Sequence, residues 1–303
     1  MPTVANSPGT ASEAEGISAH DHAPTIVFRA LFLLTIATYS CAALSPALAA
    51  PDLSAPPPAN AISFWGHSTC YIDLDGMGIV TDPVLSNGYS PLHRRKAPIP
   101  PTESYQDAKI VLISHAHHDH LNKPTLRRFS DSVTILCPAP CAKIIRKLGK
   151  RVIVMAPGES YNFPGGQIIA VAAHHPGGRN STNAEPDGRA LGFIIRTVYG
   201  TIYYSGDTDY FSGIAEVGAE YRPDLVLLNV NGHLPARDAF KAFRDLGSPQ
   251  VIPIHAGGYG GPKARMNLRQ HAEFAELLGP LASPLKVGES YPLAREVTVS
   301  NGN

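Results

Sequence analysis

The chain of 303 residues has no excess of either charge. It contains 25 Lys and Arg against 25 Asp and Glu, for a formal net charge of zero, and it has no long basic run. A protein whose main partner is nucleic acid usually carries a basic patch, so neither nucleic-acid binding nor ribonuclease activity is expected. Internal repeats and coiled-coil heptads are also absent from the sequence.

Cysteine and tryptophan are scarce, with four cysteines and one tryptophan, Trp65, which is most simply a core residue. Cys137 and Cys141 are separated by three residues, of which two are prolines. Prolines restrict the geometry that a disulfide requires, so we expect two buried free thiols. A small disulfide in an oxidising compartment is the alternative. The cysteines have none of the partners expected of a metal site and do not decide the function.

The first 49 residues have the layout of a secretory leader and signal peptide. Arg29 supplies a positive flank, residues 30–44 carry no charge, and Ala47-Leu48-Ala49 is a small-residue cleavage site. The apolar run is too short to predict a transmembrane helix. We therefore expect an exported protein, periplasmic or secreted, that is cleaved near Ala49. Membrane association is expected only if the chain stays uncleaved or is lipidated at Cys41.

The rest of the chain is expected to form one domain. Residues 50–60 are a lead rich in proline and alanine, and residues 61–303 can bury a large core as a single unit. The sequence does not indicate an oligomeric state.

The most informative segment is Ile113-Ser114-His115-Ala116-His117-His118-Asp119-His120. It follows the apolar run 110–113, which is typical of a buried strand. Imidazole nitrogens and a carboxylate gathered in the turn after a strand suit a borderline-soft divalent cation such as zinc. The spacing predicts two metals side by side, one held by His115 and His117 and the other by Asp119 and His120. The alternative is an accidental histidine cluster on an exposed loop.

Three further ligand candidates follow strand-like runs later in the chain. His174 comes after residues 168–173, Asp207 after 201–204, and His255 after 251–254. Each run is short and rich in β-branched or aromatic residues. Ligands that all stand at strand ends predict a sheet edge lined with metal ligands, which an accidental cluster does not explain.

The order His-x-His-x-Asp-His, His, Gly-Asp-Thr, His resembles the metallo-β-lactamase-fold hydrolase superfamily over about residues 61–287. The segments 64–69 and 74–83 are similar to the branch that contains ascorbate-6-phosphate lactonases and N-acylphosphatidylethanolamine phospholipase D. This resemblance implies an α+β fold, a four-layer αβ/βα sandwich of two mixed sheets with helices outside. His255-Ala256-Gly257-Gly258 replaces the Trp-Gly-Thr-Phe typical after the last ligand in the phospholipase-like branch, which weakens the expectation of that substrate.

The resemblance also implies a ligand set for two divalent ions, Zn²⁺ in the first place and Mn²⁺ as the alternative. Asp207 would bridge the two ions. A slip of one residue would put His175 in the place of His174, and His118 is expected to make no metal bond. The implied ligands are His115, His117 and His174 on the first ion, and Asp119, His120 and His255 on the second.

Four residues near this set have a possible role beside the metals. Asp82 either orients a ligand histidine or serves an Asp-Pro turn, and the two are compatible. His67 either orients substrate or water, or is a hairpin residue. Arg179 stands in a Gly-rich loop after a ligand and is a candidate for binding an anion. His233 is a candidate general acid, with a capping or surface histidine as the alternative.

We therefore predict a hydrolase in which a metal-bridging hydroxide, oriented by Asp119, attacks an ester, lactone, amide or phosphodiester of a small molecule, with an anionic substrate as one option. The basic run Arg94-Arg95-Lys96 is either an anion site or a solvated loop. Two alternatives have the same fold: an iron-dependent oxygen or persulfide oxidoreductase, and a non-catalytic metal-binding protein. Di-iron oxygen reducers typically carry Glu where His117 stands, which argues against the first.

Overall fold

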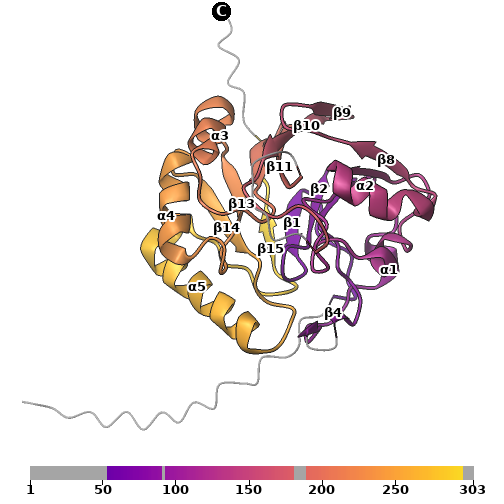
Figure 1. Cartoon of the computed structure of the whole chain (residues 1–303), viewed down its shortest axis with the longest axis horizontal. Coiled ribbons are helices and arrows are strands. Elements are labelled where there is room, and N and C mark those ends of the chain that lie inside the picture. Colours follow the sequence, from indigo (N-terminus) through magenta and orange to yellow (C-terminus); the bar gives the residue numbers. More distant parts are fainter. Residues whose placement is uncertain (1–52, 91–92, 181–188, 296–303) are drawn as a thin grey trace, which may run out of the picture. The chain divides into compact units, whose positions relative to one another are not determined.

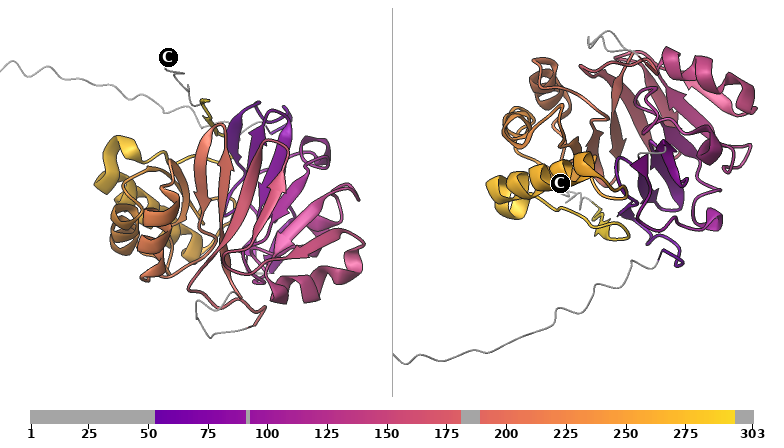
Figure 2. Two further views of the ribbon diagram at one scale, coloured as in Figure 1. Left: turned by 90° about the horizontal axis from the view of Figure 1, so that it is seen from above. Right: turned by 60° about the horizontal axis from the view of Figure 1, so that its bottom comes forward.

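The computed structural model describes residues 53–90, 93–180 and 189–295, and these form two stacked sheets with helices on both outer sides (Figures 1 and 2). The seven-stranded sheet has the order β15 (Ser290–Pro292), β1 (Ala61–Phe64), β2 (Cys70–Leu74), β3 (Met77–Thr81), β6 (Ile110–Leu112), β7 (Thr134–Cys137), β8 (Arg151–Val154). The six-stranded sheet has the order β14 (Gln250–Ile254), β13 (Leu225–Asn229), β12 (Gly200–Tyr204), β11 (Leu191–Thr197), β10 (Gly166–Ala172), β9 (Ser160–Phe163).

Short helices cover the first sheet and longer ones cover the second, as the left view of Figure 2 shows. The first sheet carries α1 (Lys123–Leu126) and α2 (Ala139–Ile145); the second carries α3 (Gly213–Tyr221), α4 (Ala236–Asp245) and α5 (Pro262–Leu278). The smaller elements are the hairpin β4 (Gly88–Ser90) and β5 (His93–Arg94), and the 3₁₀ turns η1 (Thr102–Ser104), η2 (Arg146–Leu148) and η3 (Gly279–Leu281).

The inner strands are apolar on both faces because each sheet is covered on both sides. In β10, Ile168 and Ala170 join the core between the sheets, whereas Ile169 and Val171 join the core under α3, α4 and α5. Successive side chains of a strand point to opposite faces, which explains this division. Continuous apolar runs are thus typical of sheets buried in this way.

The loops after six strands meet at one edge of the sandwich. β3, β6, β7 and β8 are parallel neighbours, and so are β12, β13 and β14. Parallel neighbours bring their carboxyl ends to the same edge. The loops that follow β1, β3, β6, β10, β12 and β14 carry the polar residues described below.

This architecture confirms the predicted αβ/βα sandwich of two mixed sheets. Cys70, Cys137 and Cys141 are buried free thiols, which confirms the expectation for the last two. The predicted leader and cleavage site lie outside the described residues, and export stays a prediction. Within the described ranges, every helix is too short or too polar to cross a membrane.

Candidate metal centre

Asp82 is the buried anchor of the edge where the loops meet. It follows β3 with a positive φ of 33° and is fully buried. Its Oδ1 accepts the backbone N–H of Ser114 at 2.7 Å, and its Oδ2 accepts from the hydroxyls of Ser114 and Tyr204. The same Oδ2 lies 2.6 Å from Nδ1 of His120. The predicted orienting role of Asp82 therefore has a geometric basis, since it directs Nε2 of His120 away from itself.

Three histidines from two loops form a first group of possible metal ligands: His115, His117 and His175. His115 Nε2 lies 2.9 Å from His117 Nδ1, which in turn lies 3.2 Å from His175 Nε2. Nδ1 of His115 is directed to the Ser114 hydroxyl at 2.9 Å, which leaves Nε2 for a ligand. Nitrogens bound at about 2.0–2.1 Å to a tetrahedral zinc lie about 3.3 Å apart, close to these separations.

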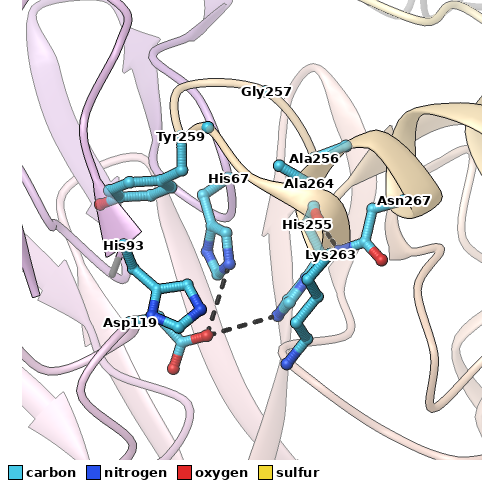
Figure 3. A pocket seen from close by; sticks show the side chains of 11 residues that line it. His67, His93, Asp119, His255, Ala256, Gly257, Tyr259, Lys263, Ala264 and Asn267 are labelled. Carbon is cyan, nitrogen blue, oxygen red and sulfur yellow. Dashed lines mark hydrogen bonds and ion pairs between the residues drawn. The ribbon is translucent and has the colours of Figure 1, made fainter. Parts of the chain in front are cut away.

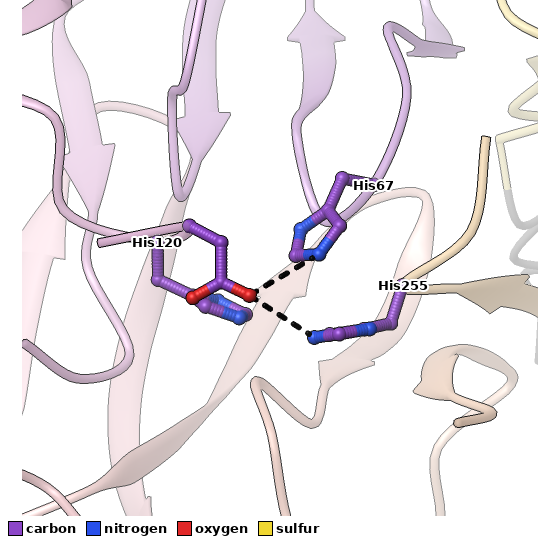
Figure 4. Close-up of side chains that lie close together, drawn as sticks. His67, His120 and His255 are labelled. Carbon is purple, nitrogen blue, oxygen red and sulfur yellow. Dashed lines mark ion pairs between the residues drawn. The ribbon is translucent and has the colours of Figure 1, made fainter. Parts of the chain in front are cut away.

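A second group comprises His67, Asp119, His120 and His255, and Figure 4 shows its three histidines gathered together. It lies beside the first group, because the rings of His115 and His120 have centroids 4.1 Å apart. Oδ2 of Asp119 lies 3.5 Å from Nε2 of His67 and 3.9 Å from Nε2 of His255. The rings of His67 and His255 have centroids 3.9 Å apart. His67, at φ 59°, and His255, at φ 74°, both adopt left-handed backbone conformations, which are sparsely populated for such residues and often occur at functional sites.

Asp207 lies between the two groups. Its Oδ2 is 3.0 Å from Nε2 of His255 and 3.4 Å from Nε2 of His120, and it is 3.8 Å from Nε2 of His175 in the first group. Oδ1 of Asp207 accepts a long hydrogen bond of 3.4 Å from Nδ2 of Asn231. A single carboxylate oxygen within reach of both groups is in the position that the bridging prediction requires.

The donor atoms fit divalent ions. Nε2 of His120 and Nε2 of His255 are buried and make no hydrogen bond of good geometry among the described residues. Buried polar atoms without such a bond are rare and costly in a protein interior. Bonds to metal ions would satisfy both atoms, and nitrogen and carboxylate ligands together suit zinc or manganese.

The electrostatics of the groups also favour cations. Burial lowers the pKa of His175 to about 3 and holds the pKa of His115 well below its usual value, so both rings are neutral, the form that binds metals. Burial opposes the charge on Asp207, but His255 and His120 outweigh it and hold its pKa well below the ordinary range. Burial lowers the pKa of His120, yet Asp207, Asp82 and Asp119 outweigh it and raise that pKa strongly. Three carboxylates thus stabilise positive charge here.

The structure corrects the prediction of His174. That ring faces away from the first group: its Nδ1 lies 3.3 Å from Oδ2 of Asp209, and the side chain is 30% exposed. His175 takes the place predicted for His174, with a fully buried side chain. β10 ends at Ala172, so the side chains of residues 174 and 175 leave in different directions, and the backbone N–H of His174 donates to Thr208 Oγ1 at 3.1 Å.

Arg179 and His118, both named from the sequence, contact each other, and neither belongs to the two groups. Nη1 of Arg179 lies 2.8 Å from Nδ1 of His118, and Nη2 donates to the carbonyl of Leu121. His118 is therefore absent from both groups, in line with the expectation that it binds no metal. Arg179 braces the ligand loop, and its predicted role in binding an anion stays a prediction.

His233 lies at the other side of the first group. Its Nδ1 is 3.3 Å from Oδ1 of Asp209, and its ring stands 4.5 Å from that of His175. The side chain is 42% exposed, so it borders the ligands from the solvent side. The predicted general acid is thus near the site, and the acid role itself stays a prediction.

Two residues of the centre were missed by sequence reasoning. The amide of Asn267, on α5, donates to the carbonyl of His255 at 2.9 Å and lies 3.3 Å from its Nδ1. Asn231 accepts the backbone N–H of His233 and contacts Asp207. Neither residue belongs to a ligand motif. Asn231 is identified only by its position after a strand, and Asn267 only by its position on a helix that faces His255.

The loop that holds His67 passes close to the loop after His255, and this close approach explains the glycines Gly66 and Gly258. His67 N–H donates to Ala256 O at 2.8 Å, and His255 N–H donates to His67 O at 2.7 Å. A Cβ on Gly66, at φ 98°, would come within 3.1 Å of Gly258 Cα. Only glycine accepts both the left-handed conformation and the contact, so this crossing fixes His67 beside His255.

Comparison with known proteins agrees with the architecture. The sequence model of a family described as the beta-lactamase superfamily domain matches residues 78–256, which contain both groups of ligands except His67. The chain belongs to the metallo-β-lactamase superfamily.

Relatives within the superfamily carry the name of metal-dependent hydrolases. A UPF0173 metal-dependent hydrolase of Methanosphaera stadtmanae is 30% identical over 237 residues, 76% of this chain and 98% of the relative. One from Exiguobacterium is 29% identical over 197 residues, 64% of this chain and 84% of the relative. The structure of Igni18, a metallo hydrolase from Ignicoccus hospitalis, shares the fold with a TM-score of 0.59 and 23% identity, over 76% of this chain and 97% of that one. Metal-dependent hydrolase is thus the enzyme class that the superfamily membership supports, whereas the narrower lactonase and phospholipase branch stays a prediction.

We expect the metal-free protein to lose stability as the pH falls below about 6.5. Burial lowers the pKa values of His67, His115 and His175, so below the ordinary value of 6.5 the unfolded chain binds protons that the folded protein does not. For His175, with a pKa of about 3, lowering the pH from about 6.5 to about 5 should cost about 2 kcal/mol. Urea unfolding of chelator-treated protein at several pH values measures this loss of stability. The unfolding free energy of His175→Gln should depend less steeply on pH than that of the wild type. An unfolding free energy that stayed constant down to about pH 5 would contradict it.

Proposed function

We propose that this protein is a hydrolase that uses two divalent metal ions, Zn²⁺ or Mn²⁺, to cleave an ester, lactone, amide or phosphodiester bond in a small molecule. The observation that carries the proposal is Asp207, whose Oδ2 is within 3.8 Å of ring nitrogens from both histidine groups. A shared carboxylate reduces the repulsion between two neighbouring cations.

The ligand assignment follows the groups in the structure. His115, His117 and His175 would hold the first ion, Asp119, His120 and His255 the second, and Asp207 both. Two ions bound there would supply a hydroxide near neutral pH and would polarise the carbonyl or phosphoryl oxygen of the substrate.

The protein residues add orientation and proton control. Burial raises the pKa of Asp119, but His120, His67 and His255 outweigh it and lower that pKa, so the carboxylate is ionised and would orient a water molecule by accepting its hydrogen bond. Burial holds the pKa of His67 well below its usual value, so its ring is neutral; it faces Asp119 and supplies a fourth side chain to the second group. Asp82 holds His120 in the tautomer that leaves Nε2 available.

The test compares His175→Ala with its neighbour His174→Ala. The first change should lower the metal content from about two ions per chain and reduce hydrolysis by more than about 100-fold, beyond the loss typical of residues that contact only a ligand. The second should leave the metal content unchanged, because His174 faces Asp209. Metal content is read by mass spectrometry, and activity with a panel of lactones, esters and phosphodiesters.

The outcomes separate the alternatives. Two zinc or manganese ions, together with hydrolysis that a chelator abolishes and added metal restores, support the proposal. A single iron per chain, or metal loss in His174→Ala instead of His175→Ala, contradicts it. Two bound ions without hydrolysis of any substrate in the panel would favour the non-catalytic alternative.

A further inference from the structure

A small pocket, open to solvent, adjoins the second group of ligands (Figure 3). His67, Asp119, His255, His93 and Lys263 are among the residues that line it, with His93 beside Asp119 and Lys263 beside His255 (Figure 3). We propose that this pocket binds the anionic group of a compact substrate, a carboxylate or a phosphate monoester, and that Lys263 selects it. This inference rests on the proposed hydrolase function and adds the substrate class to it.

The charges that line the pocket favour an anion. Asp119 is the only carboxylate among the described residues that line the pocket, and Nε2 of His67 and Nε2 of His255 lie 3.5 and 3.9 Å from its Oδ2. Lys263 is exposed in the first turn of α5 and has no ion-pair partner among the residues that the structure describes. In Figure 3 its side chain extends past His255 toward the part of the pocket where Asp119 lies. A lysine so placed attracts a carboxylate or phosphate as a point charge.

Two more cations stand behind the pocket wall and strengthen this field. Arg95 lies 6.0 Å from the ring of Tyr259 and donates to the carbonyls of Trp65 and Pro98, and it pairs with no carboxylate of the residues that the structure describes. The stem of Lys96 runs beside Gly260, where an added Cβ would meet Lys96 Cε at 3.1 Å. The basic run noted in the sequence thus supports the wall, with Arg95 held by backbone oxygens. Charges of one sign around a concave site focus the field into it.

The size of the pocket limits the substrate. Its walls include Ala256 and Ala264, which have only a methyl group, and Gly257 and Gly260, which have no side chain. Its enclosed space is about 20 Å³, little more than one water molecule needs, so the pocket admits a small group such as a carboxylate and excludes a bulky one. A substrate with its scissile bond at Asp119 and its anionic group at Lys263 would span the pocket.

The test uses two esters with acyl chains of similar length on the metal-loaded full chain. Mono-4-nitrophenyl glutarate carries a free carboxylate, and 4-nitrophenyl butyrate carries none. Lys263→Ala should raise KM for the anionic ester about 10-fold, the lower end for a hydrogen bond to a charged group, and leave KM for the neutral ester unchanged. Lys263→Glu should raise KM for the anionic ester further. Arg265→Ala, which removes a charge from the same exposed helix outside the pocket, should match the wild type.

A binding measurement keeps this inference separate from the proposed hydrolysis. Calorimetry with glutarate and with inorganic phosphate should show weaker binding to Lys263→Ala than to Arg265→Ala, and the tighter of the two ligands identifies the anionic group. If neither ester is cleaved but this difference is found, ester hydrolysis fails and the anion site stands. Equal effects of Lys263→Ala on both esters, or equal anion binding by the two variants, would overturn the anion site.

Discussion

Replacing Asp207 with alanine should remove metal from both sites and reduce hydrolysis by more than about 100-fold, since losses of 10–100-fold are typical when a residue only supports a ligand. The carboxylate is buried, and its Oδ2 lies 3.0 Å from His255, 3.4 Å from His120 and 3.8 Å from His175. Without it, two dications would repel each other with no shared carboxylate between them. Metal analysis and activity on the same preparation measure the effect.

Asp209→Ala is the matched control for this prediction. Asp209 stands two residues along the same loop, but its oxygens face His174 and His233, and its side chain is 32% exposed. We expect this variant to keep about two ions per chain. If Asp207→Ala retained both ions and full activity, the bridging assignment would be wrong. Equal metal loss in both variants would instead indicate damage to the loop.

Asp82→Ala should destabilise the metal-free protein by about 3–5 kcal/mol, the range observed when one partner of a buried charged pair is removed. Asp82 is fully buried and accepts from Ser114 N–H, the Ser114 hydroxyl and the Tyr204 hydroxyl, and it pairs with His120. Alanine would leave each of those buried donors without its acceptor. The free energy of unfolding in urea is the measurement.

Tyr204→Phe provides the comparison, because it removes one of those donors and leaves Asp82 in place. We expect it to cost about 1 kcal/mol, as for a single hydrogen bond. Asp82→Asn should fold better than Asp82→Ala, because it keeps the shape, yet it should weaken metal binding about 10–100-fold by misorienting His120. An unfolding free energy of Asp82→Ala equal to that of the wild type would refute the anchoring role of Asp82.

The ligand motif could be predicted from the sequence because its residues are contiguous. His115, His117, Asp119 and His120 follow one buried strand, so local spacing alone brings them to one turn. Asp207 and His255 were also found, because each stands directly after a β-rich run that the structure shows as β12 and β14. The same reasoning identified Asp82 after β3.

The choice between His174 and His175 could not be made in this way. Two adjacent histidines after one strand satisfy the same pattern, and a shift of one residue reverses which side chain faces the site. The structure decides it through the end of β10 at Ala172 and the hydrogen bond from His174 N–H to Thr208. A contact between residues 34 positions apart therefore decides which of the two histidines faces the site, and no local sequence pattern contains that information.

By itself the sequence determined the apolar strands, the ligand types and their order, because these depend on neighbours in the chain. Only the tertiary structure decided which residues of distant segments share the centre. His67 reaches His255 through the crossing of two glycine-containing loops, and Asn267 and Lys263 reach it from α5. The physical reason is that the pairing of the two sheets and the docking of α5 depend on the packing of the whole core, which places side chains that share no motif.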